Sequence, residues 1–231
     1  MELSSLLVVG FLLGVRHALD PDHVASVATI STSTRTLMDG LKQGATWGVG
    51  HTLTLLLFGG SALLLGFSVP EDLALILELA VGVMLVLLGA DVVRRIINER
   101  IHAHRHDHAD GASHLHVHSH AYSDRHEHSH SAFIPLRALY VGLMHGLAGS
   151  AALLLLTVAA APSLSAGIIY ILVFGVGSIL GMALLSVMVA LPLRLSSKRF
   201  ERAQRNFRFG ISIVTIILGL SIVRNILVAS L

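Results

Sequence analysis

Residues 3–30 read LSSLLVVGFLLGVRHALDPDHVASVATI, an apolar stretch that contains two imidazoles and two carboxylates near its middle. An apolar stretch of this length is long enough to cross a hydrocarbon core of about 30 Å. An ionised group inside a membrane costs at least a few kcal/mol, so such groups usually face a cavity and mark a pathway. The stretch therefore predicts a first membrane-spanning helix with a polar site inside it.

The composition of the whole chain supports a membrane protein. Of the 231 residues, 54% are hydrophobic and only 13% are charged, about half the usual charged share of a soluble domain. Cysteine is absent, which excludes disulfides and thiolate metal sites. The formal net charge is +2, and the basic residues are bunched in linkers, which favours a role in topology over nucleic-acid binding. Because Glu2 precedes the first segment, we interpret that segment as a spanning helix and not as a signal peptide.

Six apolar segments predict an all-α polytopic membrane protein with six transmembrane helices. The segments are 3–30, 44–66, 71–97, 134–161, 164–193 and 208–230. The linkers that follow the first, third and fifth segments are basic, and the other linkers are not. The positive-inside rule therefore predicts that the basic linkers are cytoplasmic and that both termini lie outside. The chain then divides into helices 1–3 (1–97), a cytoplasmic loop (98–133) and helices 4–6 (134–231). The basic linker 194–208 is typical of an anchor that touches anionic membrane lipid.

Three short motifs recur in the same order and at nearly the same spacing along the chain. The motif at Gly14 recurs at Gly142, the one at Gly48 recurs at Gly175, and the one at Leu88 recurs at Leu218. Helices 4–6 would then repeat helices 1–3, and because three is odd the two copies would be inverted across the membrane. Inverted repeats are typical of transporters, with the substrate site between the halves. The alternative is coincidence, because Gly, Leu and Val are common in this chain.

The polar run in the first segment has the chemistry of a metal site. His17, Asp20, Asp22 and His23 bring together imidazole, which suits nickel, cobalt, copper and zinc, and carboxylate, a compatible partner. Pro21 lacks an N–H, so we expect a kink and an exposed carbonyl at His17. Irregular backbone at membrane depth is tolerated only beside protein or a water-filled cavity. The alternative is that the run is simply the cytoplasmic end of a helix.

Two further histidines and one acid lie within or near other segments. We expect His51, in the second segment, to be a metal ligand or a group that orients one. His145, in the fourth segment, fits a ligand and a hydrogen-bonded packing residue equally well. Glycines beside both would allow close helix packing. Asp91 is followed within one turn by Arg94 and Arg95, so an interfacial salt bridge competes with a role in proton coupling.

The loop between the third and fourth segments is rich in histidine. It lacks apolar periodicity, so we expect it to be disordered without metal and to buffer, sense or hand over divalent metal on the cytoplasmic side. Its histidines are His102, His104, His106, His108, His114, His116, His118, His120, His126, His128 and His130.

The run from Arg16 to His23 resembles the signature of the nickel/cobalt transporter family, which is commonly HAxDADH. Gly48-Val49-Gly50-His51-Thr52 resembles the Gly-His-Ser/Thr motif of that family's next helix. The six-span form and the motif around His145 look like the small, urease-associated nickel permease branch. Pro21 departs from the usual Ala, and the further acidic motifs of the eight-span members are absent from this sequence.

The resemblance implies that His17, Asp22, His23 and His51 are required for metal selection and transport. It implies a secondary permease, not an enzyme, in a prokaryotic inner membrane, with Ni²⁺ or Co²⁺ as transported substrate and no organic cofactor. A cytoplasmic metal acceptor is a candidate partner, whereas nucleic acid is not expected. Uptake is the favoured direction, although the His-rich loop also resembles the family's exporters.

Other classes of protein share parts of this pattern. A membrane metalloenzyme would share the buried His and Asp residues, but no HExxH motif occurs in the apolar segments. A membrane-anchored metal sensor would use the His-rich loop, and an exporter of a small anion would share only the six-span repeat. No GxxxxGK[ST] motif is present, so the chain itself is not expected to use ATP.

Overall fold

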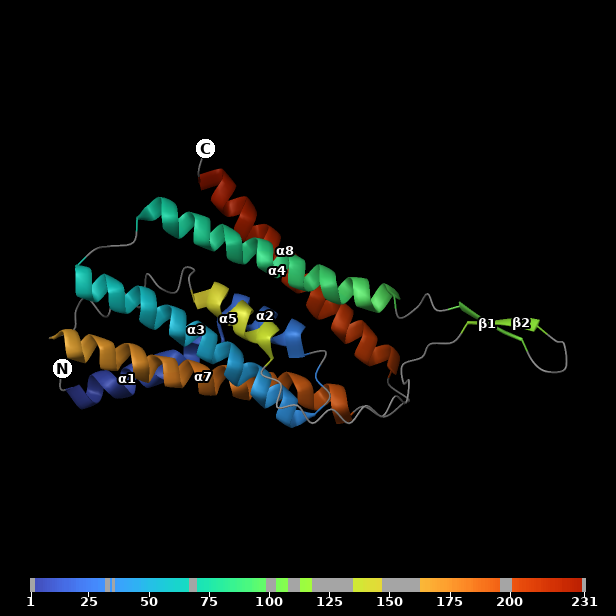
Figure 1. The fold of residues 1–231 in the computed structure, drawn as a ribbon, viewed down its shortest axis with the longest axis horizontal. Coiled ribbons are helices and arrows are strands. Elements are labelled where there is room, and N and C mark those ends of the chain that lie inside the picture. The colour runs from blue at the N-terminus through green and yellow to red at the C-terminus, as the bar shows by residue number, and fades with distance from the viewer. Residues whose placement is uncertain are drawn as a thin grey trace.

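In the computed structural model, the described residues form helices and one two-stranded hairpin (Figure 1). These residues are 3–31, 34, 36–66, 70–98, 103–107, 113–117, 135–146, 163–195 and 201–229. The helices are α1 (Leu3–His17), α2 (Pro21–Ser31), α3 (Leu37–Leu65), α4 (Glu71–Asn98), α5 (Leu136–Gly146), α7 (Leu164–Leu195) and α8 (Glu201–Ala229). The strands are β1 (Ala103–Asp107) and β2 (Ser113–Val117).

Four of the described helices are long and apolar enough to cross a membrane. They are Leu37–Leu65, Asp72–Asn98, Leu164–Leu191 and Ala203–Ala229. Ser4–His17 is a shorter apolar helix, and the predicted fourth segment, 134–161, is described only as far as Gly146. Large apolar side chains such as Leu57 and Leu87 are more than 60% exposed, as expected where a helix faces lipid. The helices support an integral membrane protein, and the count of six spans stays a prediction.

The first predicted segment is two helices and not one kinked helix. α1 ends at His17 and α2 begins at Pro21, the position where proline is favoured because its missing N–H needs no partner. The carbonyl of His17, expected to be exposed, accepts a hydrogen bond from the N–H of Asp20 at 3.0 Å. The expectation of a free carbonyl was therefore wrong, because a tight turn between the helices satisfies it.

Two other helices begin earlier than their hydropathy predicted. α3 begins at Leu37 and not near Gly44, because Thr36 and Asp39 form a capping box that starts the helix in a polar stretch. α8 begins at Glu201, so several basic residues assigned to a linker lie in its first turns. With these bounds, His51 lies near the middle of α3, about 20 Å from the start of the helix.

The helices pack as one series of four and one separate pair (Figure 1). α1 packs on α7, α7 on α3 and α3 on α5, while α4 and α8 pack on each other. Two glycines permit the closest approaches to the backbone of another helix. A Cβ at Gly14 would collide with the carbonyl of Phe174 in α7, and a Cβ at Gly142 would collide with the carbonyl of Trp47 in α3. α2 contacts α4, α7 and α8 and is buried along most of its length. The helix break and the middle of α3 therefore lie in the interior of the bundle.

The hairpin projects from one end of the helices at the right of Figure 1. β1 and β2 are antiparallel, and their register pairs His104 with His116 and His106 with His114. The other histidines of the predicted loop lie outside the described residues. The expected disorder of the metal-free loop stays a prediction.

Candidate metal centre

Four histidines from three of the predicted segments meet at the break between α1 and α2. His17 ends α1, His23 lies in the first turn of α2, His51 is in α3 and His145 is in α5. All four are buried, with 8% or less of each residue exposed. The ring centroids of His17 and His23 are 4.3 Å apart, and those of His23 and His145 are 4.5 Å apart. The imidazoles thus form one continuous buried cluster.

Two carboxylates determine which ring nitrogens of this cluster carry protons. Asp20 Oδ2 lies 2.7 Å from His17 Nδ1. Asp22 lies between two rings, with Oδ1 3.0 Å from His23 Nδ1 and Oδ2 3.0 Å from His145 Nε2. Because an ionised carboxylate only accepts hydrogen bonds, each of these three nitrogens acts as a donor. The opposite nitrogen of each neutral ring then presents a lone pair, as in the carboxylate–histidine pairs that orient metal ligands.

Several of the lone-pair nitrogens have no protein partner. Among the described residues, His23 Nε2, His51 Nδ1 and His145 Nδ1 are buried without a hydrogen bond. His17 Nε2 is different, because it accepts a hydrogen bond from His51 Nε2–H at 3.2 Å, which leaves the lone pair of His51 on Nδ1. A buried polar atom without a partner costs about 1–3 kcal/mol, so native proteins seldom keep several together without a ligand or water. This cluster is suited to bind a cation that accepts nitrogen donors.

Two overlapping sets of donors lie close enough together to hold a metal ion. One set is His17, His23 and His51, and the other is Asp22, His23 and His145. Within each set the donor atoms all lie within 4.8 Å of one another. Modest side-chain shifts would bring them to the distance of about 2 Å at which imidazole nitrogen and carboxylate oxygen bind a transition metal. Neutral imidazole with carboxylate suits Ni²⁺, Co²⁺, Cu²⁺ and Zn²⁺.

Aromatic side chains line two sides of the cluster. The Trp47 ring centroid is 5.4 Å from that of His23 and 5.5 Å from that of His145. The Phe174 ring centroid is 5.4 Å from that of His17. Apolar rings exclude water and lower the local dielectric constant, which strengthens the attraction between a cation and its ligands.

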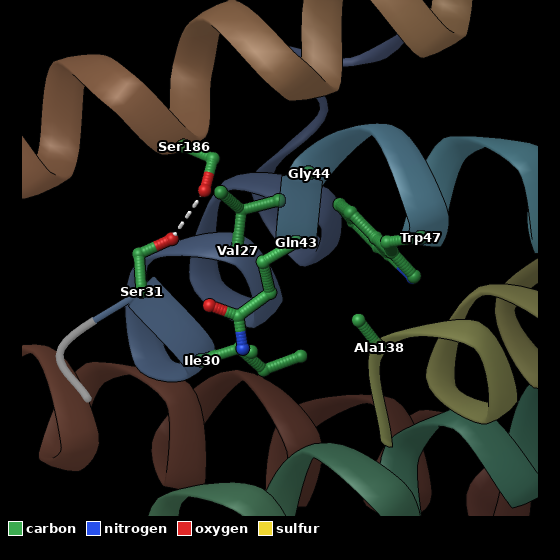
Figure 2. Close-up of a pocket in the computed structure, with 8 residues that line it drawn as sticks. All are labelled: Val27, Ile30, Ser31, Gln43, Gly44, Trp47, Ala138 and Ser186. Atoms are coloured by element: carbon green, nitrogen blue, oxygen red, sulfur yellow. Dashed lines mark hydrogen bonds between the residues drawn. The ribbon is translucent and has the colours of Figure 1, made fainter. Parts of the chain in front are cut away.

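Trp47 also lines a small pocket, whose lining includes none of these histidines (Figure 2). The pocket has an empty volume of about 170 Å³. Its polar side chains include Ser31 and Ser186, whose hydroxyl oxygens are 2.7 Å apart, and Gln43. The remaining lining residues are Val27, Ile30, Gly44 and Ala138.

The sequence-predicted residues separate into a group that meets and others that lie apart. The structure brings together the four residues of the family motifs with His145, and places Asp20 beside His17. Asp91 lies apart on α4, where it forms exposed ion pairs with Arg95 and Arg137 at 3.2 and 2.7 Å. Trp47, which contacts His23 and His145, was not predicted as a site residue. Its position directly before the Gly48-Val49-Gly50-His51 motif is the signal that could have indicated it.

The geometry defines the class as a helical membrane protein with a buried cluster of nitrogen donors that could hold a cation. Comparison with known proteins is more specific. Residues 3–230 match the family of high-affinity nickel-transport proteins. The chain belongs to this family, and it is a transporter rather than an enzyme. The resemblance noted in the sequence is therefore confirmed.

Three relatives extend this comparison. The chain is 34% identical over 204 residues to the urease accessory protein UreH of Bacillus sp. (strain TB-90), covering 87% of this chain and 83% of the relative. It is 27% and 29% identical to the chloroplast proteins FOR GROWTH AND FERTILITY 2 and 1 of Arabidopsis thaliana, each over 93% of this chain. The chain spans only 55% and 57% of those two plant proteins. No solved structure matches the chain significantly.

Proposed function

We propose that the protein is a secondary permease that takes up Ni²⁺, and also Co²⁺, through the buried histidine cluster. The observation that carries the proposal is the convergence of His17, Asp22, His23 and His51, with His145, at a helix break. Helix breaks that expose donors inside a bundle are typical of transporter binding sites. Asp20 would hold the ring of His17 in position, because it accepts a hydrogen bond from Nδ1.

Transport through a central site requires that the site open to each side in turn. We propose six spans arranged as two inverted three-helix repeats, which rock against each other around the cluster. Helix contacts support this arrangement. Gly14 packs against Phe174, and Gly142 packs against Trp47. At the spacing of the repeat, Gly142 is the counterpart of Gly14 and Phe174 is the counterpart of Trp47, so one contact is the counterpart of the other.

A second pair of contacts has the same relationship. A Cβ at Gly50 would collide with the carbonyl of Leu139, and a Cβ at Gly177 would collide with that of Phe11. At the same spacing, Gly177 is the counterpart of Gly50 and Leu139 is the counterpart of Phe11. If the two halves were similar only by chance, a contact from the first half to the second would not have a counterpart from the second half to the first. The contacts thus favour the repeat over compositional coincidence.

We further propose that the protein lies in a prokaryotic inner membrane with both termini outside. The support is the alternation of basic and non-basic linkers. The His-rich loop, which includes β1 and β2, would then be cytoplasmic and would buffer metal or pass it to a cytoplasmic acceptor. Resemblance of this loop to family exporters keeps export as a second candidate direction.

Flux of radiolabelled nickel into proteoliposomes tests the proposal directly. We expect wild-type vesicles to accumulate nickel, cobalt to compete, and His17→Ala to reduce flux at least about tenfold. Vesicles in which protease accessibility shows one orientation separate uptake from export. Absence of nickel flux in either orientation, with correctly folded protein, would overturn the proposal.

A further inference from the structure

We propose that the transported metal occupies two alternative positions in the histidine cluster and passes between them through His23, which belongs to both. The inference rests on the proposed transport function and adds a step to it. The first position is formed by His17, His23 and His51, and the second by Asp22, His23 and His145. The sets share only the His23 ring.

The two nitrogens of His23 are on different sides of its ring and have different surroundings. Nδ1 is 3.0 Å from Asp22 and belongs to the side of the second position. Nε2 is buried and has no hydrogen-bond partner among the described residues, so it is free to bind metal in the first position. His23 is in ring contact with His17, His51 and His145, with centroid distances of 4.3, 5.1 and 4.5 Å. It is therefore placed to serve either set of ligands.

The two positions exclude each other because of the chemistry of imidazole. A neutral ring carries one proton and offers one lone pair to a metal. In the first position Nε2 of His23 binds the metal while Nδ1–H donates to Asp22. In the second position Nδ1 binds the metal, which requires its proton to leave to water and a proton from water to reach Nε2. The ring keeps one proton in both states, so the net charge of the site does not change with the transfer of the metal.

The aromatic side chains beside the two metal positions indicate which position lies nearer the pocket lined by Trp47. Phe174 lies against His17, which belongs to the first position. Trp47 lies against His145, which belongs only to the second position, and against the shared His23. Trp47 also lines the pocket shown in Figure 2. The second position is therefore the one next to the pocket. A metal ion on the pathway would meet the three imidazoles at one end and the carboxylate at the other.

The ligand sets also differ in charge and composition. The first has three neutral imidazoles, whereas the second has two imidazoles and one carboxylate. Removing His51 leaves the second set complete, and removing His145 leaves the first set complete. A single site shared by all five groups would instead lose one ligand in either variant. The two arrangements can thus be distinguished by which ligands remain around the metal.

The experiment uses the full-length protein in detergent and compares His51→Gln, His145→Gln, their combination and His23→Gln. Equilibrium dialysis with radiolabelled Ni²⁺ measures binding, and His23→Gln, which should lose both positions, gives the background from the His-rich loop. We expect wild type and each single variant to bind about one ion above this background, and the double variant none. Each single variant should nevertheless lose flux in proteoliposomes at least about tenfold.

X-ray absorption spectroscopy counts the imidazoles that coordinate the bound nickel. The spectrum of His23→Gln is subtracted to remove the contribution of the His-rich loop. We expect three in His145→Gln and two in His51→Gln. Asp72→Asn, at an exposed position in the first turn of α4, should leave flux unchanged, and size-exclusion profiles check that every variant is folded. Glutamine is chosen because it is polar and preserves more volume than alanine.

Three outcomes would overturn the two-position inference while leaving nickel transport intact: loss of specific binding in either single variant, the same imidazole count in both, or retained binding in the double variant. A wild-type protein without nickel flux would instead contradict the proposed function.

Discussion

The imidazole Nε2 of His145 lies 3.0 Å from Oδ2 of Asp22, although the two residues belong to opposite halves of the chain. This contact connects α5 to the start of α2 and joins the two halves of the sequence at the candidate site. Asp22 also accepts a hydrogen bond from His23. One half-buried carboxylate therefore orients two of the four clustered rings, and substitutions at this contact should affect transport more than folding.

We predict that Asp22→Asn reduces nickel flux at least about tenfold. An amide has no charge to attract the cation, and its NH₂ cannot accept the hydrogen bonds that the second carboxylate oxygen accepts. Radiolabelled nickel flux in proteoliposomes measures the change. Asp72→Asn is the matched control, because Asp72 is exposed at the start of α4. Equal flux in Asp22→Asn and wild type would refute a role for this carboxylate.

Gly142→Ala should destabilise the protein by about 1–3 kcal/mol, in the range of overpacked interiors. The new methyl group would collide with the backbone carbonyl of Trp47, which cannot move without moving α3. Gly60→Ala is the matched control, because nothing lies within 4 Å of its added Cβ and alanine is favoured over glycine inside a helix. Thermal unfolding in detergent should show a lower midpoint for the first variant only.

Asp91→Asn should leave nickel flux and its pH dependence unchanged. The carboxylate is one-third exposed and pairs with the exposed side chains of Arg95 and Arg137, and such surface pairs contribute at most about 1 kcal/mol. Flux measured across a range of pH values would test this interpretation. If Asp91 couples protons to transport, the variant would lose flux or lose its response to a proton gradient.

Deletion of residues 102–130 should preserve substantial nickel flux at saturating metal, because the buried cluster does not include this segment. The deletion removes all the histidines of the loop together with both strands of the hairpin. Total bound nickel in equilibrium dialysis should fall at the same time. If instead the loop is the functional part of a sensor, flux would be absent in both proteins and the metal response would disappear with the loop.

Much of the candidate site could be predicted from local sequence because its residues stand out chemically. His17, Asp22 and His23 are polar residues in an apolar segment, and His51 follows a glycine motif. The free-energy cost of placing such groups inside a membrane indicates that they have a functional role. The break at Pro21 was also predictable, since proline removes a helical hydrogen bond. The form of the break was not, because the turn that satisfies the His17 carbonyl depends on the residues between the helices.

Helix limits were less predictable where polar residues start a helix. The capping box at Thr36 begins α3 well before its apolar part, because it satisfies N–H groups that hydropathy does not register. His51 consequently lies in the middle of the helix and not near one end. That position matters, because the middle of α3 is where His17 of α1 and the end of α5 both approach.

The sequence by itself determined that this chain is a helical membrane protein with candidate metal ligands in its first two predicted spans, since apolar length and buried charge are local properties. Only the tertiary structure decided that His145 belongs with them, that Asp91 does not, and that Trp47 contacts both the cluster and a pocket. The physical reason is that a lone histidine in a span satisfies packing and metal binding equally well. Its neighbours across helix interfaces, and not its own segment, distinguish the two.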